Sequence, residues 1–316
     1  MHLYDPFIER DLPAIPAAVA RYRAEHGSEE TFKAVGRFAV LAYAPSQHAK
    51  HALLACLAAW DLRDDPCFDD VVTQCAVYAA ESRQPWSEPP IMTPPAIDDA
   101  QRGDLDELLA AIDASDRLRG ERWLAKRYED DSFFADYFAA AAGDFEDLGH
   151  KLIVAAAARR LVPILGEQGK FATLRVGIWE MTAYRGDEHF EEEGVALDAG
   201  TLFARLVDTF AANRGDIIDA HALFLLDAAQ QTEDERVIRR VRDFLTNVGQ
   251  AISPVRGGNG QAGLPVLQPY KLARDYAECL KIHALARRRP ELPVEAMLAA
   301  AHDNLERSHF DEMSYA

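Results

Sequence analysis

The sequence predicts an all-α fold, on three observations. Apolar residues recur at helical spacing along most of the chain, between segments rich in turn-forming residues. No segment has a clear strand pattern. Four stretches repeat a histidine, one further residue and a leucine within an apolar run. We therefore expect one multi-helix domain over residues 1–316, or two tightly joined helical halves, with histidine-bearing helices around an interior cavity.

In the N-terminal half, capping and breaking residues define the expected helices. Pro13 and Pro16 lie near the start of the first helix and Gly27 ends it. Ser46 is a suitable N-cap for a later, longer helix, with Pro45 just outside it. The helices expected here lie within residues 1–27 and over residues 28–43, 48–61, 67–81, 104–115, 120–130 and 132–142.

The C-terminal half is expected to be equally helical. An almost wholly apolar run follows His150, and Pro163 limits the last turn of that buried helix. Leu174 and Ile178 keep helical spacing in a segment whose residues also favour strands. The helices expected here cover residues 150–165, 170–184, 201–213, 217–231, 233–251, 270–289 and 294–308.

Two segments interrupt the helical pattern. The prolines of residues 84–103 exclude a regular helix and predict an extended connection. This segment is a simple connector, a boundary that subdivides the domain, or a strap over the entrance of a site. Residues 253–269 are rich in glycine and predict a flexible linker or lid.

The composition is that of a globular, acidic protein. The chain has 316 residues, 49% of them hydrophobic, and 52 acidic against 34 basic residues give a net charge of −18. Such a surface repels phosphate backbones and anionic lipids, so we expect neither nucleic acid nor a membrane as the main partner. The four cysteines lack a CxxC spacing and we see no signal peptide, so we expect reduced thiols and a cytoplasmic location.

Histidines in the apolar stretches are the candidate site residues. His48 and His51 are three residues apart and share a helix face, whereas His150 and His221 lie on other predicted helices. Burial lowers the pKa of an imidazole, and the neutral ring can bind a metal or act in proton transfer. We take His48, His150 and His221 as candidate catalytic residues and candidate metal ligands.

Two carboxylates accompany these histidines. Asp147 and Asp219 precede His150 and His221 by one turn or less. A carboxylate at this spacing can fix an imidazole tautomer or bind a metal with it, although acidic residues are also common at helix starts. With His51 and His283, the two carboxylates are expected to contact the substrate or support the site.

Well-known catalytic motifs do not account for these residues. The sequence has no HExxH, no pair of ExxH motifs and no GxSxG. His302-Asp303 is an HD dipeptide, but few residues remain downstream to supply the further ligands of an HD phosphohydrolase. The glycines of residues 257–260 lack the strand and the residue order of a phosphate-binding loop, and no dinucleotide-binding fingerprint for a flavin appears.

The histidine stretches resemble the questin oxidase-like family in order along the chain, from about residue 38 to residue 290. The run QHAKHALLACLAA stands where that family has an Asn-His-Gly-Pro-Met stretch leading into an alanine- and leucine-rich helix. GHKLI, which contains His150, matches the (Thr/Gly)-His-x-Leu-Ile helix of the family most closely. DAHAL corresponds to a third histidine helix, and ECLKIH is faintly similar to a late one, with Cys279 where the family has histidine.

This resemblance implies an oxidoreductase that performs a Baeyer–Villiger-like oxygenation and ring cleavage of an anthraquinone or another aromatic polyketide, with NADPH and O2. The histidines would then act as general acid and base groups or as ligands of a metal such as iron. Two alternatives remain open from the residues alone. One is a metal-dependent hydrolase or lyase that uses the same histidines, and the other is a non-catalytic helical binding protein.

Overall fold

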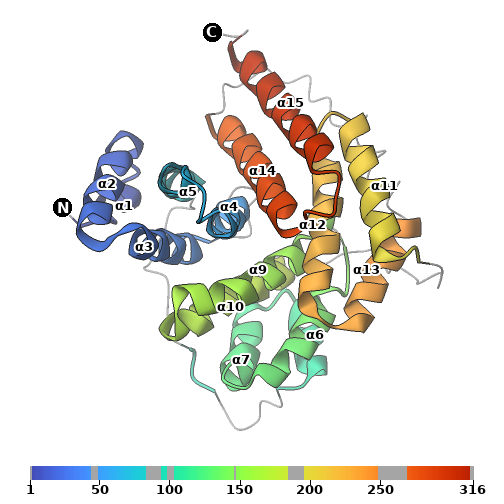
Figure 1. The fold of residues 1–316 in the computed structure, drawn as a ribbon. Helices are drawn as coiled ribbons and strands as arrows, with labels where there is room; N and C mark the ends of the chain where they lie inside the picture. The colour runs from blue at the N-terminus through green and yellow to red at the C-terminus, as the bar shows by residue number, and fades with distance from the viewer. Residues whose placement is uncertain are drawn as a thin grey trace. The chain divides into compact units, whose positions relative to one another are not determined.

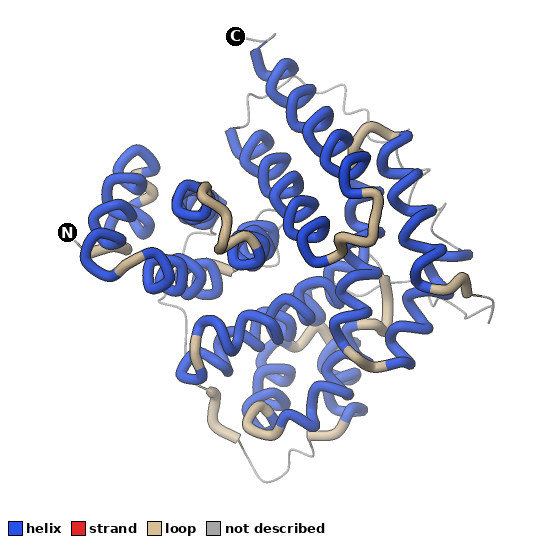
Figure 2. Tube along the Cα trace, viewed as in Figure 1, coloured by secondary structure: helices blue, strands red, loops and turns tan. Residues whose placement is uncertain are grey.

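The computed structural model describes residues 2–43, 49–82, 94–97, 103–145, 147–183, 196–247 and 269–313. Within these ranges it confirms the all-α prediction, because the regular elements are fifteen α-helices and four short 3-10 helices, with no strand (Figures 1 and 2). None of the helices described has both the length and the apolar character needed to cross a bilayer.

The chain forms two compact units, which are described separately. Unit 1 comprises Met1–Ala141 and Val154–Arg185, and unit 2 comprises Ala142–Ile153 and Gly186–Ala316. One of the passages between them lies inside helix α9 (His150–Leu165). The subdivision considered near residues 84–103 falls largely outside the residues described, and the chain on both sides of that segment belongs to unit 1.

Unit 1 is built from two groups of helices. Helices α2 to α5 pack on one another, α6 to α8 lie close to α10 or to each other, and α3 also contacts α10. The helices are α1 (Asp5–Glu9), α2 (Ile15–His26), α3 (Ser28–Leu41), α4 (Ala49–Asp61), α5 (Phe68–Ser82), α6 (Leu105–Asp113), α7 (Arg117–Arg127), α8 (Phe134–Ala141), the main part of α9, and α10 (Lys170–Ala183).

Aromatic rings and one ion pair fill the interior of unit 1. Tyr137 and Phe138 of α8 are buried, and the Tyr137 hydroxyl donates to the Leu174 carbonyl at 2.8 Å. Lys50 of α4 forms a buried ion pair with Glu180 of α10, with Nζ 2.8 Å from Oε1, and the Tyr43 hydroxyl donates to the other carboxylate oxygen. These polar groups satisfy one another inside an otherwise apolar contact.

Unit 2 is arranged around α12. This helix contacts α11, α13, α14 and the short helix that precedes α9, while α15 packs on α14 and α11 (Figure 1). Asp227 of α12 pairs with Arg288 and Arg289 at the end of α14. The helices are the first residues of α9, α11 (Ala199–Ala212), α12 (Ile217–Thr232), α13 (Glu235–Asn247), α14 (Pro269–Arg288) and α15 (Val294–Met313).

The observed helix ends lie close to the predicted ones. Helix α3 begins at Ser28, as predicted, and Glu29 and Glu30 in its first turn suit the positive end of the helix dipole. Pro163 lies inside the last turn of α9, and the helix ends two residues later, before Gly166 with φ 97°.

Candidate metal centre

An unusual turn sets the start of α9 in unit 2. Asp147, Leu148 and Gly149 all have positive φ, at 48°, 62° and 77°. Two of them are not glycine, so the turn stores backbone strain. A Cβ atom on Gly149 would lie 2.8 Å from both terminal methyl carbons of Leu225 in α12. Glycine therefore allows the start of α9 to approach α12 closely, and this approach places His150 against that helix.

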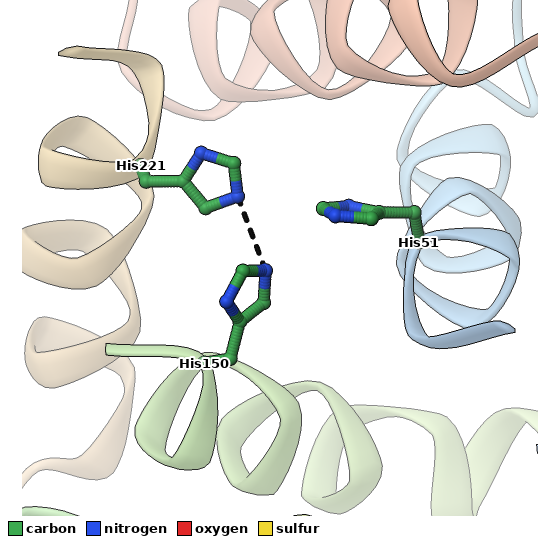
Figure 3. Close-up of side chains that lie close together, drawn as sticks. All are labelled: His51, His150 and His221. Atoms are coloured by element: carbon green, nitrogen blue, oxygen red, sulfur yellow. Dashed lines mark hydrogen bonds between the residues drawn. The ribbon is translucent and has the colours of Figure 1, made fainter. Parts of the chain in front are cut away.

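His150 and His221 face each other across this contact. Their Nε2 atoms are 3.1 Å apart, and the ring centroids are 4.7 Å apart with the ring planes at 60° (Figure 3). Each residue is only 2% exposed. We call these two residues the buried pair.

The backbone fixes the tautomer of both rings. His150 Nδ1 is hydrogen-bonded to the Asp147 carbonyl, and His221 Nδ1 lies 2.6 Å from the Ile217 carbonyl. A carbonyl oxygen only accepts hydrogen bonds, so each Nδ1 must carry the proton and donate. In a neutral imidazole the other nitrogen, Nε2, then has the lone pair. The buried pair therefore points two lone pairs at each other.

Two facing lone pairs repel, so a positive charge between them would stabilise the arrangement. A proton would make one ring an imidazolium that donates to the other ring. Burial opposes that state, since desolvation lowers the pKa of His221, although the carboxylate of Glu278 acts in the opposite direction. A metal ion satisfies both lone pairs while both rings stay neutral.

The distance within the buried pair fits one shared metal ion. Two imidazole nitrogens bound at about 2.1 Å to the same ion are about 3.0–3.4 Å apart for ligand angles of roughly 90–110°. The observed separation of 3.1 Å lies in that range. The carbonyl bonds at Nδ1 are the outer contacts that commonly orient metal-binding histidines.

Two charged side chains of α14 influence the pKa of His221. Glu278 and Lys281 are buried and form an ion pair at 2.7 Å, and Lys281 Nζ lies 4.7 Å from the centre of the Phe224 ring. The Phe224 ring is also an edge-on neighbour of His221. Of the two charges, the Glu278 carboxylate acts to raise the pKa of His221 and Lys281 to lower it. Glu278 thereby also favours a cation at the buried pair.

Each sequence-predicted site residue has a different place. His48 lies outside the residues described. His51 is buried on α4 of unit 1. The Asp147 carboxylate is 3.5 Å from His150 Nδ1. Asp219 accepts a hydrogen bond from Asn213, so its carboxylate links α12 to the end of α11.

His283 contacts His302 rather than the buried pair. Its Nε2 atom is 2.9 Å from Nε2 of His302 on α15, and Cys279 lies one helical turn before it. The HD dipeptide is also divided, because the Asp303 carboxylate pairs with Arg214. His302 therefore belongs to a contact between α14 and α15.

Sequence reasoning missed the buried charged residues near the histidines. Lys50 directly precedes His51, and Lys281 and Glu278 flank Cys279 on α14. A lysine inside an otherwise apolar helix could have indicated a buried ion pair, since a buried lysine needs an acidic partner. Its partner in unit 1, Glu180, is 130 residues away in the sequence, which no local spacing reveals.

Comparisons with known proteins found no match among protein-family models, curated proteins or solved structures.

Proposed function

We propose that the protein is a metal-dependent oxidoreductase whose ion is held by Nε2 of His150 and Nε2 of His221. The observation that carries this proposal is the approach of two Nε2 atoms to 3.1 Å while both Nδ1 atoms bond to backbone carbonyls. This arrangement turns two imidazole Nε2 donors toward one cation. A neutral nitrogen donor set suits iron as well as zinc or copper.

The reaction class that we propose is the oxygenation of an aromatic ketone, and the resemblance around His150 supports it. In a Baeyer–Villiger-like reaction one oxygen atom of O2 enters between the carbonyl carbon and its neighbour, and the other leaves as water. NADPH supplies two electrons as a hydride and becomes NADP+, and one proton from solvent completes the water. A bound redox-active metal would supply the activation of O2.

The residues of this chain would hold the ion and control protons around it. The carbonyls of Asp147 and Ile217 keep both Nδ1 atoms protonated, so that both Nε2 atoms stay available as donors. The Asp147 carboxylate, at 3.5 Å from His150 Nδ1, lies beside the protonated nitrogen of that ring and helps to orient it. Burial of both rings excludes bulk water from the donor atoms.

The test of this proposal combines metal analysis with turnover. Protein purified without a histidine tag should contain one equivalent of metal at the buried pair. It should also consume O2 and oxidise NADPH in the presence of an anthraquinone. His150→Ala should abolish both activities while the helical circular dichroism is retained. His26→Ala is the matched control, because His26 is an exposed histidine of α2, and it should leave turnover unchanged. An active His150→Ala variant would contradict the proposal.

A hydrolase or lyase is the second candidate, and the carboxylate of Asp147 beside His150 favours it, since a carboxylate–imidazole pair suits proton transfer. Oxygen dependence separates the two reactions. Turnover that needs the metal and continues under strict anaerobiosis would assign the hydrolase or lyase. Protein that holds no metal and turns over no substrate would favour a binding protein instead.

His48 and His51 are tested in the same assay, since the sequence predicts that they share this site. Alanine at either position should reduce turnover if that prediction holds. The decisive observation for His51 is a loss of activity without a loss of fold, because this residue is also buried in unit 1. Unchanged turnover in both variants would restrict the site to unit 2.

A further inference from the structure

Three metal-binding side chains meet where α14 and α15 pack together in unit 2. Cys279 and His283 come from α14 and His302 comes from α15. One donor atom from each residue, the Cys279 sulfur and a ring nitrogen of each histidine, lies within 4.8 Å of the other two. We call these residues the Cys279 cluster.

The helices themselves produce this convergence. Cys279 and His283 are four residues apart, so their side chains lie on the same face of α14, one turn from each other. Residues 289–293 form a short turn after which α15 packs along α14. His302 thereby meets His283, with their Nε2 atoms 2.9 Å apart and their ring planes inclined by 31°.

Burial is graded across the Cys279 cluster. Cys279 is buried, His283 is half-buried and His302 is exposed. Burial raises the pKa of the Cys279 thiol to about 11, so the thiol is protonated in the absence of a metal. The side of the cluster at His302 is open to solvent, and an ion can enter there.

We propose that the Cys279 cluster is a second metal site, which binds Zn²⁺ through one thiolate and two imidazoles. Sulfur and imidazole donors suit Zn²⁺, whereas Mg²⁺ and Ca²⁺ require oxygen ligands. Three protein ligands leave the fourth tetrahedral position for water or a small anion. On binding, the thiol proton leaves to solvent and a sulfur–zinc bond takes its place.

This site goes beyond the proposed function and does not depend on it. Its ligands come only from α14 and α15, and its consequence is to tie these two helices together. Since the ion binds the folded cluster, saturating Zn²⁺ should raise the melting temperature. A hydrogen bond between His283 and His302 would account for their contact alone, but it would give the sulfur of Cys279 no role.

Cobalt substitution tests the Cys279 cluster directly, because only a thiolate ligand gives a sulfur-to-cobalt charge-transfer band in the near ultraviolet. The metal-free full-length protein is titrated with Co²⁺ and then with Zn²⁺. We expect the band to appear with Co²⁺ and to disappear when Zn²⁺ replaces it, since zinc binds such donors more tightly. The band should be absent in Cys279→Ser. In His302→Gln the affinity for Co²⁺, measured from the growth of the band, should be at least tenfold lower.

Two controls separate this site from other thiols and from the buried pair. Cys67→Ser removes the exposed cysteine of unit 1 and should leave the band unchanged. His150→Ala removes a ligand of the buried pair and should also leave it unchanged. A native protein without the band, a band that persists in Cys279→Ser, or a band lost in Cys67→Ser would overturn the proposal. His302→Gln alters an exposed residue and keeps the test decisive if Cys279→Ser does not fold.

Discussion

The buried pair and the contact between His283 and His302 have almost the same geometry in different surroundings. Their Nε2 atoms are 3.1 Å and 2.9 Å apart. The buried pair lies in the interior, follows a strained turn and has both tautomers fixed by carbonyls. His283 and His302 lie on regular helices near solvent, with a thiol close by. We therefore expect the same contact to form a preorganised metal centre in one place and an exchangeable metal site in the other.

This difference has an energetic origin. At the buried pair, the folded chain holds a strained turn and two facing lone pairs, and a bound cation would relieve the repulsion between the lone pairs. At the Cys279 cluster the helices are unstrained, and the cost of binding is the loss of the thiol proton. We therefore expect tight retention of metal at the first site and rapid exchange at the second.

The largest expected effect concerns metal retention. His221→Ala removes one of the two imidazole donors at the buried pair. The affinity of the buried pair for metal should therefore fall by more than about 100-fold, which exceeds the usual effect of mutating a residue that only hydrogen-bonds to a ligand. His302→Gln should leave that affinity unchanged. Elemental analysis after exhaustive dialysis measures both. Equal metal loss in the two variants would remove the distinction between the sites.

A smaller effect is expected from the charge beside His221. Glu278→Gln removes a negative charge that favours a cation there and leaves Lys281 buried without its carboxylate partner. Metal affinity at the buried pair should fall by about 10-fold, and stability by roughly 3 kcal/mol. Titration calorimetry and urea unfolding measure the two losses. Glu306→Gln, at an exposed position of α15, is the matched control and should change neither quantity.

The strained turn gives a third prediction. Gly149→Ala places a Cβ at φ 77° and against Leu225, so we expect a loss of roughly 2–4 kcal/mol in the free energy of unfolding. Gly200→Ala, in the first turn of α11, meets only ordinary contacts and should be neutral or slightly stabilising. If urea unfolding gave the two variants equal stability, the turn would not be strained.

The smallest expected effect lies at the exposed end of the Cys279 cluster. In metal-free protein His302→Gln should change stability by less than about 0.5 kcal/mol, because surface substitutions rarely cost more. Zn²⁺ should raise the melting temperature of the native protein by more than that of this variant, which keeps only the buried pair as a metal site. A large loss of stability without metal would mean that His302 is a structural residue rather than an exchangeable ligand.

Local sequence patterns predicted the helices well. They predicted the contacts His150–His221 and His283–His302 only in part. Apolar spacing and caps identified the helices that carry His150, His221 and His283, since these signals depend on neighbouring residues. The sequence also singled out Asp147, but as a carboxylate. Its backbone carbonyl, held by a turn of positive φ, turned out to be the group that fixes the His150 tautomer.

Pairings across the fold were beyond the sequence. His302 appeared only as part of an HD dipeptide, because its contact with His283 depends on how α14 and α15 pack and not on spacing. The same holds for Lys50 and Glu180, which meet through the packing of α4 and α10. The choice of His221 as the partner of His150 likewise depends on the absence of a side chain at Gly149.

The tautomers of His150 and His221 provide the most direct test of a shared cation. Long-range nitrogen–proton correlation NMR on protein with ¹⁵N-labelled histidine reports which ring nitrogen carries a proton. We predict protonated Nδ1 in both rings, and Nε2 resonances that shift together when one equivalent of Zn²⁺ is added to metal-free protein. A proton on Nε2 of either ring that persists in the presence of the metal would contradict the account.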